Sequence, residues 1–393
     1  MNIRSLSVAF AAFALAGLCR AEEQYTLTTD DFSSAKVSLV KIDAAGVTVS
    51  DPIGQRVLPL AHVVSLAKQS TKPDTISGLV LCTAGGDRLV GTPQKLEGNN
   101  IVWFASGVGS VSVPLDQCTG VLRDKTSSAD LSSNRAEDQA KLVTGDTVKG
   151  IVTDITDKGF VLTPQQGDPV TLSPDSIASL LFATPPGGRK VAPPAGLVVH
   201  VTGGTSVSCS AVTEADSKLA LTLPGGRNAV IPMTQVTAIE NANGAVSWLS
   251  SRQPVASEYT PFFQGNFPAQ FDRSVVGEPI RFGGVTYRHG IGVHSRSKLT
   301  FAVQPGDATF RTRYALDGNL GYGDVNVRVR VDDKVIHEAK DFHSGVLSPV
   351  VQADVSGAKT VTLEVDFGGA YDVQDRLNWI EPAMLRSAAT TQP

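Results

Sequence analysis

Valine alternates with polar residues along two segments near the C-terminus, residues 325–331 and 360–367. A period of two is typical of an antiparallel strand that has one buried and one solvated face. Residues 310–316 and 350–355 fit shorter strands, and glycine-rich turns separate the segments. The pattern therefore predicts a jelly-roll β-sandwich over residues 259–386.

The first half of the chain contains an internal repeat. The segment 113–121 has counterparts at 172–180 and 231–239, and both steps are 59 residues. A second landmark, residues 87–91, recurs with the same step at 146–150 and 205–209. Residues 58–66 form an earlier copy, which lacks a clear first strand. Two landmarks that keep one spacing indicate a repeated structural unit.

Each copy reads as a set of short strands. In one copy, residues 147–156 and 159–163 are expected as strands joined by the turn Asp157-Lys158-Gly159, and shorter strands are expected at 170–172 and 177–182. This pattern resembles SH3-like and Sm-like barrels. A unit this small buries little surface alone, so we expect the copies to pack on one another in pairs or in a row.

The composition agrees with an all-β chain, because 37 glycines and 22 prolines favour many turns. We expect tandem small SH3/Sm-like β-barrel repeats followed by the sandwich. The expected segments are a signal peptide at 1–21, a degenerate repeat at 22–70, repeats at 71–125, 141–184 and 196–241, linkers at 126–140, 185–195 and 242–258, the sandwich at 259–386, and a disordered tail at 387–393.

The N-terminus has the order of a secretory signal peptide. A short basic start ending at Arg4 precedes an apolar run at 6–18 and a small residue, Ala21. We therefore expect cleavage near Ala21 and a secreted, periplasmic or cell-envelope protein. A membrane anchor is the alternative, but the run is short for a bilayer span. A lipoprotein anchor at Cys19 is another, although Leu18 stands where a small residue is usual. No later apolar stretch is long enough for a membrane span.

The charge balance limits the expected binding partners, and the cysteines allow one disulfide. The 34 Lys and Arg against 38 Asp and Glu give a mild net charge, which does not favour nucleic acid or an acidic membrane as a partner. Cys82 and Cys118 are candidates for a disulfide in an oxidising compartment, which would leave Cys209 unpaired. The alternative is that all three are small buried hydrophobes, since the repeat makes Cys118 an ordinary core position.

Several ordered motifs carry a family resemblance. Residues 290–299 read Gly-Ile-Gly-Val-His-Ser-Arg-Ser-Lys-Leu, and Asp372-Val373-Gln374-Asp375 precede Asn378-Trp379 and 383–385. Together with lead-in segments at 248–250 and 259–263, they resemble the NPCBM domains, which are related to the modules of glycoside hydrolase family 98. The resemblance covers about Trp248 to Leu385 and implies a galactose-binding-like sandwich that binds carbohydrate. The repeats lie outside it.

Two stretches bear on whether the family's binding is kept. The loop 317–324 stands where the family has an acidic, glycine-containing loop, and Arg376-Leu377 replaces a small or histidine-containing pair. If these loops form the sugar site, the resemblance implies altered specificity or lost binding.

Sugar recognition needs an aromatic platform and planar polar groups, of which charged ones bond more strongly. Six residues within nine positions supply this set: Tyr371, Asp372, Gln374, Asp375, Arg376 and Trp379. For Trp379 we favour a core position over a ligand contact. Tyr371, Asp372 and Asp375 follow Gly368-Gly369 and are therefore expected on a loop, which makes them the better candidates.

Further candidates lie outside this loop. We expect a structural role for His294, which sits in a predicted strand, rather than a sugar contact. Asp317, Asn319, Tyr322 and Asp324 lie in a second polar loop, which either lines a site or is an ordinary solvated turn. A structural calcium would suit loop oxygens, but the spacing assigns no metal.

No enzyme motif is present in the sequence, although paired carboxylates of a glycosidase leave no local spacing signature. We therefore predict an exported, non-catalytic protein in which the repeats space or scaffold a module for a galactose-containing glycan. One alternative is a protein-binding envelope scaffold with a degenerate sandwich. A second alternative is an unrecognised glycoside hydrolase.

Overall fold

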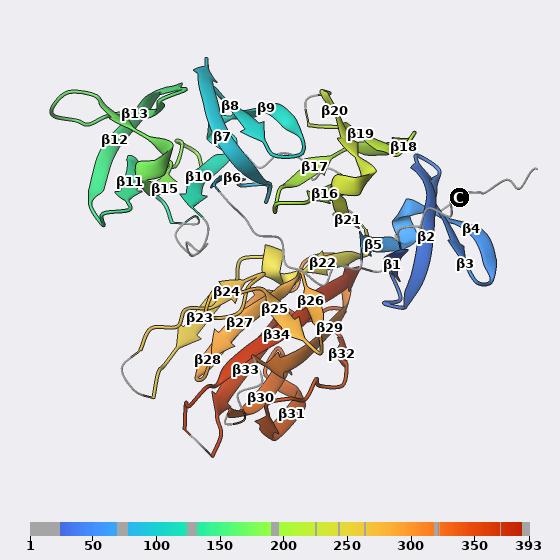
Figure 1. Ribbon diagram of the computed structural model, residues 1–393. Coiled ribbons are helices and arrows are strands. Elements are labelled where there is room, and N and C mark those ends of the chain that lie inside the picture. Colours follow the sequence, from blue (N-terminus) through green and yellow to red (C-terminus); the bar gives the residue numbers. More distant parts are fainter. Residues whose placement is uncertain are drawn as a thin grey trace, which may run out of the picture.

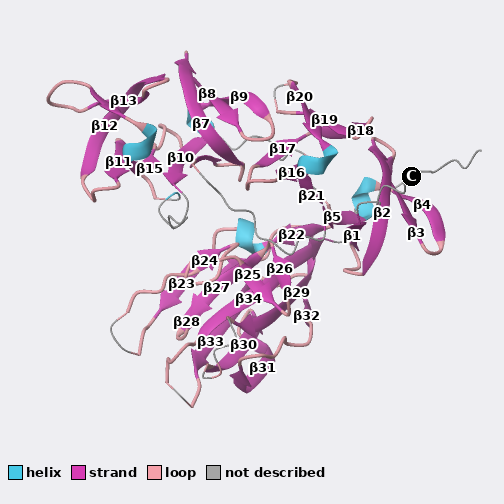
Figure 2. Cartoon of the chain, in the orientation of Figure 1, coloured by secondary structure: helices cyan, strands magenta, loops and turns pink. Residues whose placement is uncertain are grey.

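The computed structural model describes residues 24–68, 78–123, 131, 133–189, 196–224, 226–242, 244–262, 265–317, 321, 323–369 and 371–386. Antiparallel strands dominate the described part, with a few single-turn 3-10 helices (Figure 2). The predicted all-β class is confirmed. The expected signal peptide, the tail at 387–393 and parts of the linkers fall outside the described residues.

Four five-stranded units form an array. Unit 1 comprises β1 (Gln24–Thr29), β2 (Ser34–Asp43), β3 (Gly46–Asp51), β4 (Gly54–Leu58), η1 (Leu60–His62) and β5 (Val63–Lys68). Unit 2 comprises β6 (Leu79–Thr83), β7 (Arg88–Glu97), β8 (Asn100–Ala105), β9 (Gly109–Pro114), η2 (Leu115–Gln117) and β10 (Cys118–Arg123).

Units 3 and 4 follow the same plan, with one strand split in unit 4. Unit 3 comprises β11 (Asp138–Leu142), β12 (Thr147–Thr156), β13 (Gly159–Thr163), β14 (Val170–Leu172), η4 (Pro174–Ser176) and β15 (Ile177–Leu181). Unit 4 comprises β16 (Leu197–Val201), β17 (Ser206–Cys209), β18 (Ala211–Ala215), β19 (Lys218–Thr222), β20 (Asn228–Pro232), η5 (Met233–Gln235) and β21 (Val236–Asn241).

Local sequence explains the shape of a unit. Pro59, Pro114 and Pro232 cap the 3-10 turn before the last strand, and the fixed φ of proline suits that turn. Gly91 and Gly150 are equivalent positions in the long second strand, where a Cβ would lie 1.8 and 2.4 Å from a carbonyl oxygen of the next strand. Only glycine allows this approach, so the second strand can bend and the small sheet can curve.

The units are joined through their strand edges in the spatial order 3–2–4–1 (Figure 1). The last strands β10 and β15 pair between units 2 and 3, and β21 and β5 pair between units 4 and 1. A single bridge, Ser206 to Arg88, joins β17 of unit 4 to β7 of unit 2. One hydrophobic core runs through all four units, which confirms that the copies pack on one another.

Two sheets form a sandwich below the array in Figure 1. The first sheet is ordered β24 (Gln270–Phe271), β27 (Gly290–His294), β34 (Arg376–Arg386), β29 (Asp307–Leu316) and β32 (Val351–Asp354), with β22 (Val246–Trp248) on β34. The second is ordered β23 (Ala256–Tyr259), β28 (Ser297–Ala302), β33 (Thr360–Phe367), β30 (Asp324–Val331) and β31 (Lys334–His343). A hairpin of β25 (Ile280–Phe282) and β26 (Val285–Tyr287) completes the domain.

The alternating valines face the space between the two sheets. Val325, Val327 and Val329 of β30 are fully buried, in a core that also holds Phe310 and Trp379. Burying this apolar surface is the main stabilising term of the sandwich.

Three details differ from the sequence-based expectations. Residues 242–258, expected as a linker, contribute β22, β23 and the 3-10 turn η6 (Leu249–Ser251) to the sandwich. The stretch expected as a linker at 126–140 ends inside β11, and unit 1 does have a first strand, β1. Short strands such as Val246–Trp248 give no alternation to recognise, because only their partner strand fixes them.

The candidate disulfide between Cys82 and Cys118 does not form, and the alternative is confirmed, because Cys82, Cys118 and Cys209 are all free, buried thiols. Cys82 lies in a small cluster with Val80 and Val90, whereas Cys118 lies in the large core of the array. The two side chains therefore face opposite sides of the β6–β10 pair, and sequence spacing could not reveal this. Among the described residues, no helix has the length and apolar character to cross a membrane.

The sandwich docks on the array next to units 1 and 4. Trp248 of β22 meets Phe32 of unit 1 edge to face at 6.2 Å, and the Arg311 guanidinium lies 4.0 Å from the centre of the Phe32 ring. On the unit 4 side, His289 of the sandwich places Nε2 2.8 Å from a carboxylate oxygen of Glu240. The joint therefore combines aromatic packing with a buried ion pair.

Candidate functional site

Four loops meet at the end of the sandwich that points away from the array (Figure 1). Their described parts are the turn 295–296, residues 317, 321 and 323, residues 368–369 and 371–375, and residues 260–262 and 265–269. The pairing of the strands that flank these loops brings the loops together. In the first sheet His294 pairs with Arg376 and Leu316 with Leu377. In the second sheet Val325 pairs with Phe367 and Tyr259 with Ser297. Residues more than a hundred positions apart therefore share one surface, which we call the loop end.

Asp375 is the central polar residue of the loop end. Its side chain is fully buried, and Oδ2 accepts a 2.6 Å hydrogen bond from the Ser295 hydroxyl. Oδ1 has no hydrogen-bond partner among the described residues. Burial raises the pKa of Asp375 to about 7, and the negative charges of Asp324 and Asp372 add to the shift. A buried acceptor without a partner is uncommon and calls for an explanation.

Asp324 lies beside it, at the start of β30. Its Oδ2 accepts a 2.7 Å hydrogen bond from the backbone N–H of Gly369. A Cβ on Gly368 would lie 2.6 Å from the same oxygen, so the Gly-Gly pair lets the loop approach this carboxylate. The loop that carries Tyr371 is thus held against the acidic residues.

Aromatic side chains form the outer rim. Phe262 and Tyr371 are 46% and 59% exposed, and their ring centres lie 5.0 Å apart at a tilt of 44°. Phe367 meets Phe262 edge to face at 5.4 Å. Tyr371 has φ of +66°, a conformation that a bulky residue rarely adopts. Exposing two large rings side by side on a loop suits a binding surface better than a packing role.

The other predicted residues occupy different positions. Gln374 lies next to Asp375, and its Oε1 has no partner among the described residues. Arg376 is half-buried at the start of β34, and Asp372 is half-buried beside Tyr371. Trp379 is fully buried in the core against Tyr314.

His294 is buried under Phe267, with the rings stacked at 4.7 Å, and its Nδ1 lies 3.0 Å from the carbonyl oxygen of Ser295. Burial raises the pKa of Asp317, and its neighbours Asn378 and Ser274 oppose that rise. Asn319 and Tyr322 lie outside the described residues.

Sequence reasoning did not select Phe262 or Ser295 as site residues, whereas it placed Asp324 in the second polar loop. Phe262 follows a proline in an aromatic lead-in, and an exposed ring there is a detectable signal. Ser295 lies inside the His-Ser motif, but its bond to Asp375 joins residues 80 positions apart. That contact depends on strand pairing and leaves no local pattern.

Comparison with protein families agrees with this geometry. Residues 245–385 match the NPCBM/NEW2 domain. The chain therefore carries an NPCBM/NEW2 domain in its C-terminal third, as the motifs predicted. The match begins at the stretch that supplies β22, which explains why that strand belongs to the sandwich.

One curated relative aligns with part of the chain. It is a Renibacterium salmoninarum protein named "Putative endo-alpha-N-acetylgalactosaminidase", which is 26% identical over 113 residues. The alignment covers 28% of this chain and 8% of that protein, so this chain spans less than a tenth of the relative's length.

Solved structures similar to this chain include modules named CBM51. A CBM51 module of Clostridium perfringens GH95, in complex with methyl-galactose, is 20% identical and covers 35% of this chain and 99% of its own, with a TM-score of 0.33. CBM51-2 with GlcNAc and INT domains, from Clostridium perfringens ZmpB, is 18% identical and covers 55% and 44%, with a TM-score of 0.34. Likenesses at these TM-scores add no argument beyond the family match.

Proposed function

We propose that the loop end of the sandwich binds a carbohydrate. The observation that carries this proposal is the exposed Phe262–Tyr371 pair at the same end as Asp375, a buried carboxylate whose Oδ1 has no partner among the residues that the structure describes. The C–H face of a sugar ring packs on aromatic rings, while its hydroxyl groups donate to carboxylate oxygens. One ligand of this class would use both features.

Each residue has a defined part in this proposal. Phe262 and Tyr371 provide the platform, and Asp372 and Gln374 bond hydroxyl groups at the rim. Asp375 accepts from a deeper hydroxyl through Oδ1, held in place by Ser295. His294 and Arg376 shape the floor. The ionised form of Asp375 is the stronger acceptor, so binding should strengthen as the pH rises through about 7.

We propose a galactose-containing glycan, with or without an N-acetyl group, as the ligand class. The two Clostridium perfringens structures are complexes with methyl-galactose and GlcNAc, respectively. These two sugars are therefore the first probes.

The proposals on export, on the role of the repeats and on binding without catalysis rest on the sequence. The basic and apolar N-terminus supports export, with the mature protein beginning near Glu22, which N-terminal sequencing of the exported protein tests. Each repeat is proposed as a small SH3-like barrel and the sandwich as a jelly roll. We further propose that the array acts as a spacer or scaffold and that the sandwich binds without catalysis.

The test is calorimetric titration of the full chain with methyl-galactose and GlcNAc, followed by a glycan array, with and without calcium. Phe262→Ala should weaken binding at least about tenfold. Phe104→Ala is the matched control, because Phe104 is 47% exposed but lies on unit 2. Absence of binding to any glycan by the folded chain, or equal effects of both variants, would refute the proposal.

A catalytic function is distinguished in the same samples. Hydrolysis of chromogenic glycosides that is abolished by Asp375→Asn would replace the binding proposal with a glycosidase. No turnover, together with saturable binding, supports a binding module.

A further inference from the structure

Units 2 and 4 meet through equivalent surfaces. The bridge pairs Arg88 with Ser206, and these two residues occupy the same position in their units, two repeat steps apart. An antiparallel bridge between equivalent residues places a local two-fold axis between the two units. This position lies at the start of the second strand of each unit. We call the surface around it the turn face.

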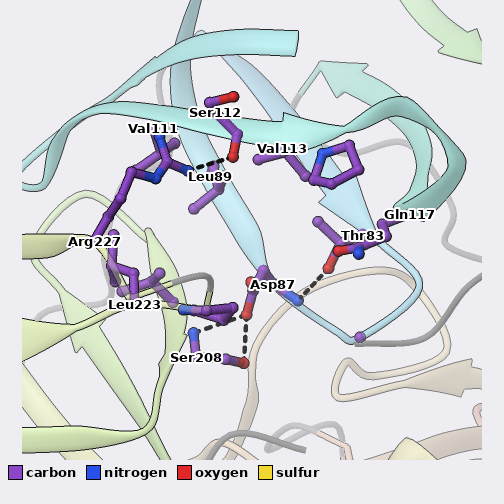
Figure 3. A pocket seen from close by; sticks show the side chains of 14 residues that line it. Thr83, Asp87, Leu89, Val111, Ser112, Val113, Gln117, Ser208, Leu223 and Arg227 are labelled. Carbon is purple, nitrogen blue, oxygen red and sulfur yellow. Dashed lines mark hydrogen bonds between the residues drawn. The ribbon is translucent and has the colours of Figure 1, made fainter. Parts of the chain in front are cut away.

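Hydrogen bonds across the contact are reciprocal. Asp87 Oδ1 of unit 2 accepts from the backbone N–H of Ser208 at 2.8 Å and from its hydroxyl at 2.6 Å. Thr205, the equivalent of Asp87 in unit 4, accepts in turn from the N–H of Val90, the equivalent of Ser208. Figure 3 shows Asp87 directed at Ser208. The turn face is therefore self-complementary, as an isologous interface requires.

Apolar residues fill the rest of this contact. Leu89 and Val207 occupy equivalent positions and are 2% and 4% exposed. Val111 is also buried, and Figure 3 shows it beside Leu89 and across from Leu223 and Arg227 of unit 4. A cavity of about 90 Å³ remains between the two units.

Unit 3 leaves the same positions open to solvent. Asp146 and Lys149, the equivalents of Asp87 and Val90, are both exposed, as is Thr147 at the centre. Val170, the equivalent of Val111, is 41% exposed, and Val143 on the neighbouring turn is 58% exposed. Within the described chain, the start of β12 pairs only with strands of its own unit.

The remaining self-complementary surfaces are occupied. The last strands pair through the equivalent residues Val121 and Leu180 in units 2 and 3, and Leu66 and Ile239 in units 1 and 4. The corresponding turn of unit 1 packs its Phe32 against the sandwich. The turn face of unit 3 is thus the end of the array at which the same contact can be repeated.

We propose that two copies of this chain associate through the turn faces of unit 3, about a two-fold axis that passes between their Thr147 residues. In this arrangement Asp146 of each copy accepts from the Lys149 backbone N–H of the other and pairs with its ammonium group. An isologous contact makes this acid–base pair twice, and it covers Val143 and Val170. The dimer carries two sandwiches, so a surface with several glycans would be bound with avidity.

Charge reversal tests this contact in the full chain by sedimentation equilibrium. Asp146→Lys and Lys149→Asp each bring like charges together twice, and each should raise the dimer dissociation constant at least about tenfold. The double variant restores opposite charges and should recover the dimer. Asp157→Lys, on the opposite turn of the same unit, is the control and should leave the dissociation constant unchanged.

Cross-linking tests the position of the axis. A Thr147→Cys variant should form a disulfide-linked dimer on oxidation, whereas Asp157→Cys should not. A chain that stays monomeric at all concentrations, or a dimer insensitive to both single reversals, would overturn the proposal. The outcome is independent of glycan binding, which is measured at the other domain.

Discussion

At the array end of the sandwich, buried charges meet opposite charges, whereas at the loop end buried carboxylates meet one another. Arg252 donates two hydrogen bonds, 2.7 and 2.9 Å, to the two carboxylate oxygens of Asp307, and both side chains are almost fully buried. At the loop end Asp375 lies near Asp324 and has an oxygen with no partner among the described residues. The array end pairs its buried charges, whereas the loop end holds a buried carboxylate oxygen that the proposed ligand would satisfy.

At the joint between the sandwich and unit 4, buried charges again meet opposite charges. Burial alone would raise the pKa of Glu240, but His200 and His289 outweigh it and hold that pKa well below 4.5. Burial alone would lower the pKa of His289, but Glu240 and Asp272 raise it to about 10. Both partners are therefore charged across the physiological range, and the sandwich stays docked on the array.

The largest effect is expected for Asp307→Ala. This change leaves the buried guanidinium of Arg252 without its two acceptors, so the free energy of unfolding should fall by roughly 3–5 kcal/mol. Denaturant unfolding measures it. Glu258→Ala, which removes an exposed 3.9 Å pair with Lys298, should cost less than about 0.5 kcal/mol. Similar losses of unfolding free energy in the two variants would show that the buried ion pair contributes no more than the exposed one.

His289→Ala should cost roughly 2–4 kcal/mol, because Glu240 loses one of its cations and Trp248 loses a stacked ring at 4.5 Å. The folded-state pKa of His289 lies above its unfolded value. Its contribution is therefore complete below about pH 6.5 and is lost as the pH rises through about 10. Unfolding curves at pH 7 and 10 measure this, and the exposed His343→Ala is the control. A cost that does not shrink toward pH 10 would contradict the ion pair.

Asp375→Asn should act in the opposite direction and stabilise the protein. The folded-state pKa lies above the unfolded value, so the unfolded chain releases this proton first and the free energy of unfolding falls between about pH 4 and 7. Removing the charge should therefore gain roughly 2 kcal/mol at pH 8, measured by urea unfolding. Hydrogen bonds from Ser356 lower the pKa of the exposed Asp354. Asp354→Asn should therefore lower the free energy of unfolding instead of raising it. A loss in both variants would show that Asp375 is an ordinary structural carboxylate.

How much of this the sequence reveals depends on how local each feature is. The 59-residue step predicted the repeated unit and the last strand of one copy, and the alternating valines predicted the strands β30 and β33. The spatial order of the units follows from edge pairings such as Val121 with Leu180, which no local pattern encodes. In the same way Tyr371 was recognisable as a loop residue, but its neighbour Phe262 lies 109 positions away.

The last prediction tests the loop end by separating binding from stability. Tyr371 is 59% exposed and contributes little to the core, so Tyr371→Ala should change the free energy of unfolding by less than about 0.5 kcal/mol. Glycan affinity should nevertheless fall at least about tenfold, equivalent to about 1.4 kcal/mol, because the platform is lost. Tyr371→Phe keeps the ring and should retain most of the affinity. If Tyr371→Phe weakens binding as much as Tyr371→Ala, the hydroxyl group and not the ring face makes the contact, and the aromatic pair with Phe262 would then serve packing at the loop end of the sandwich rather than recognition.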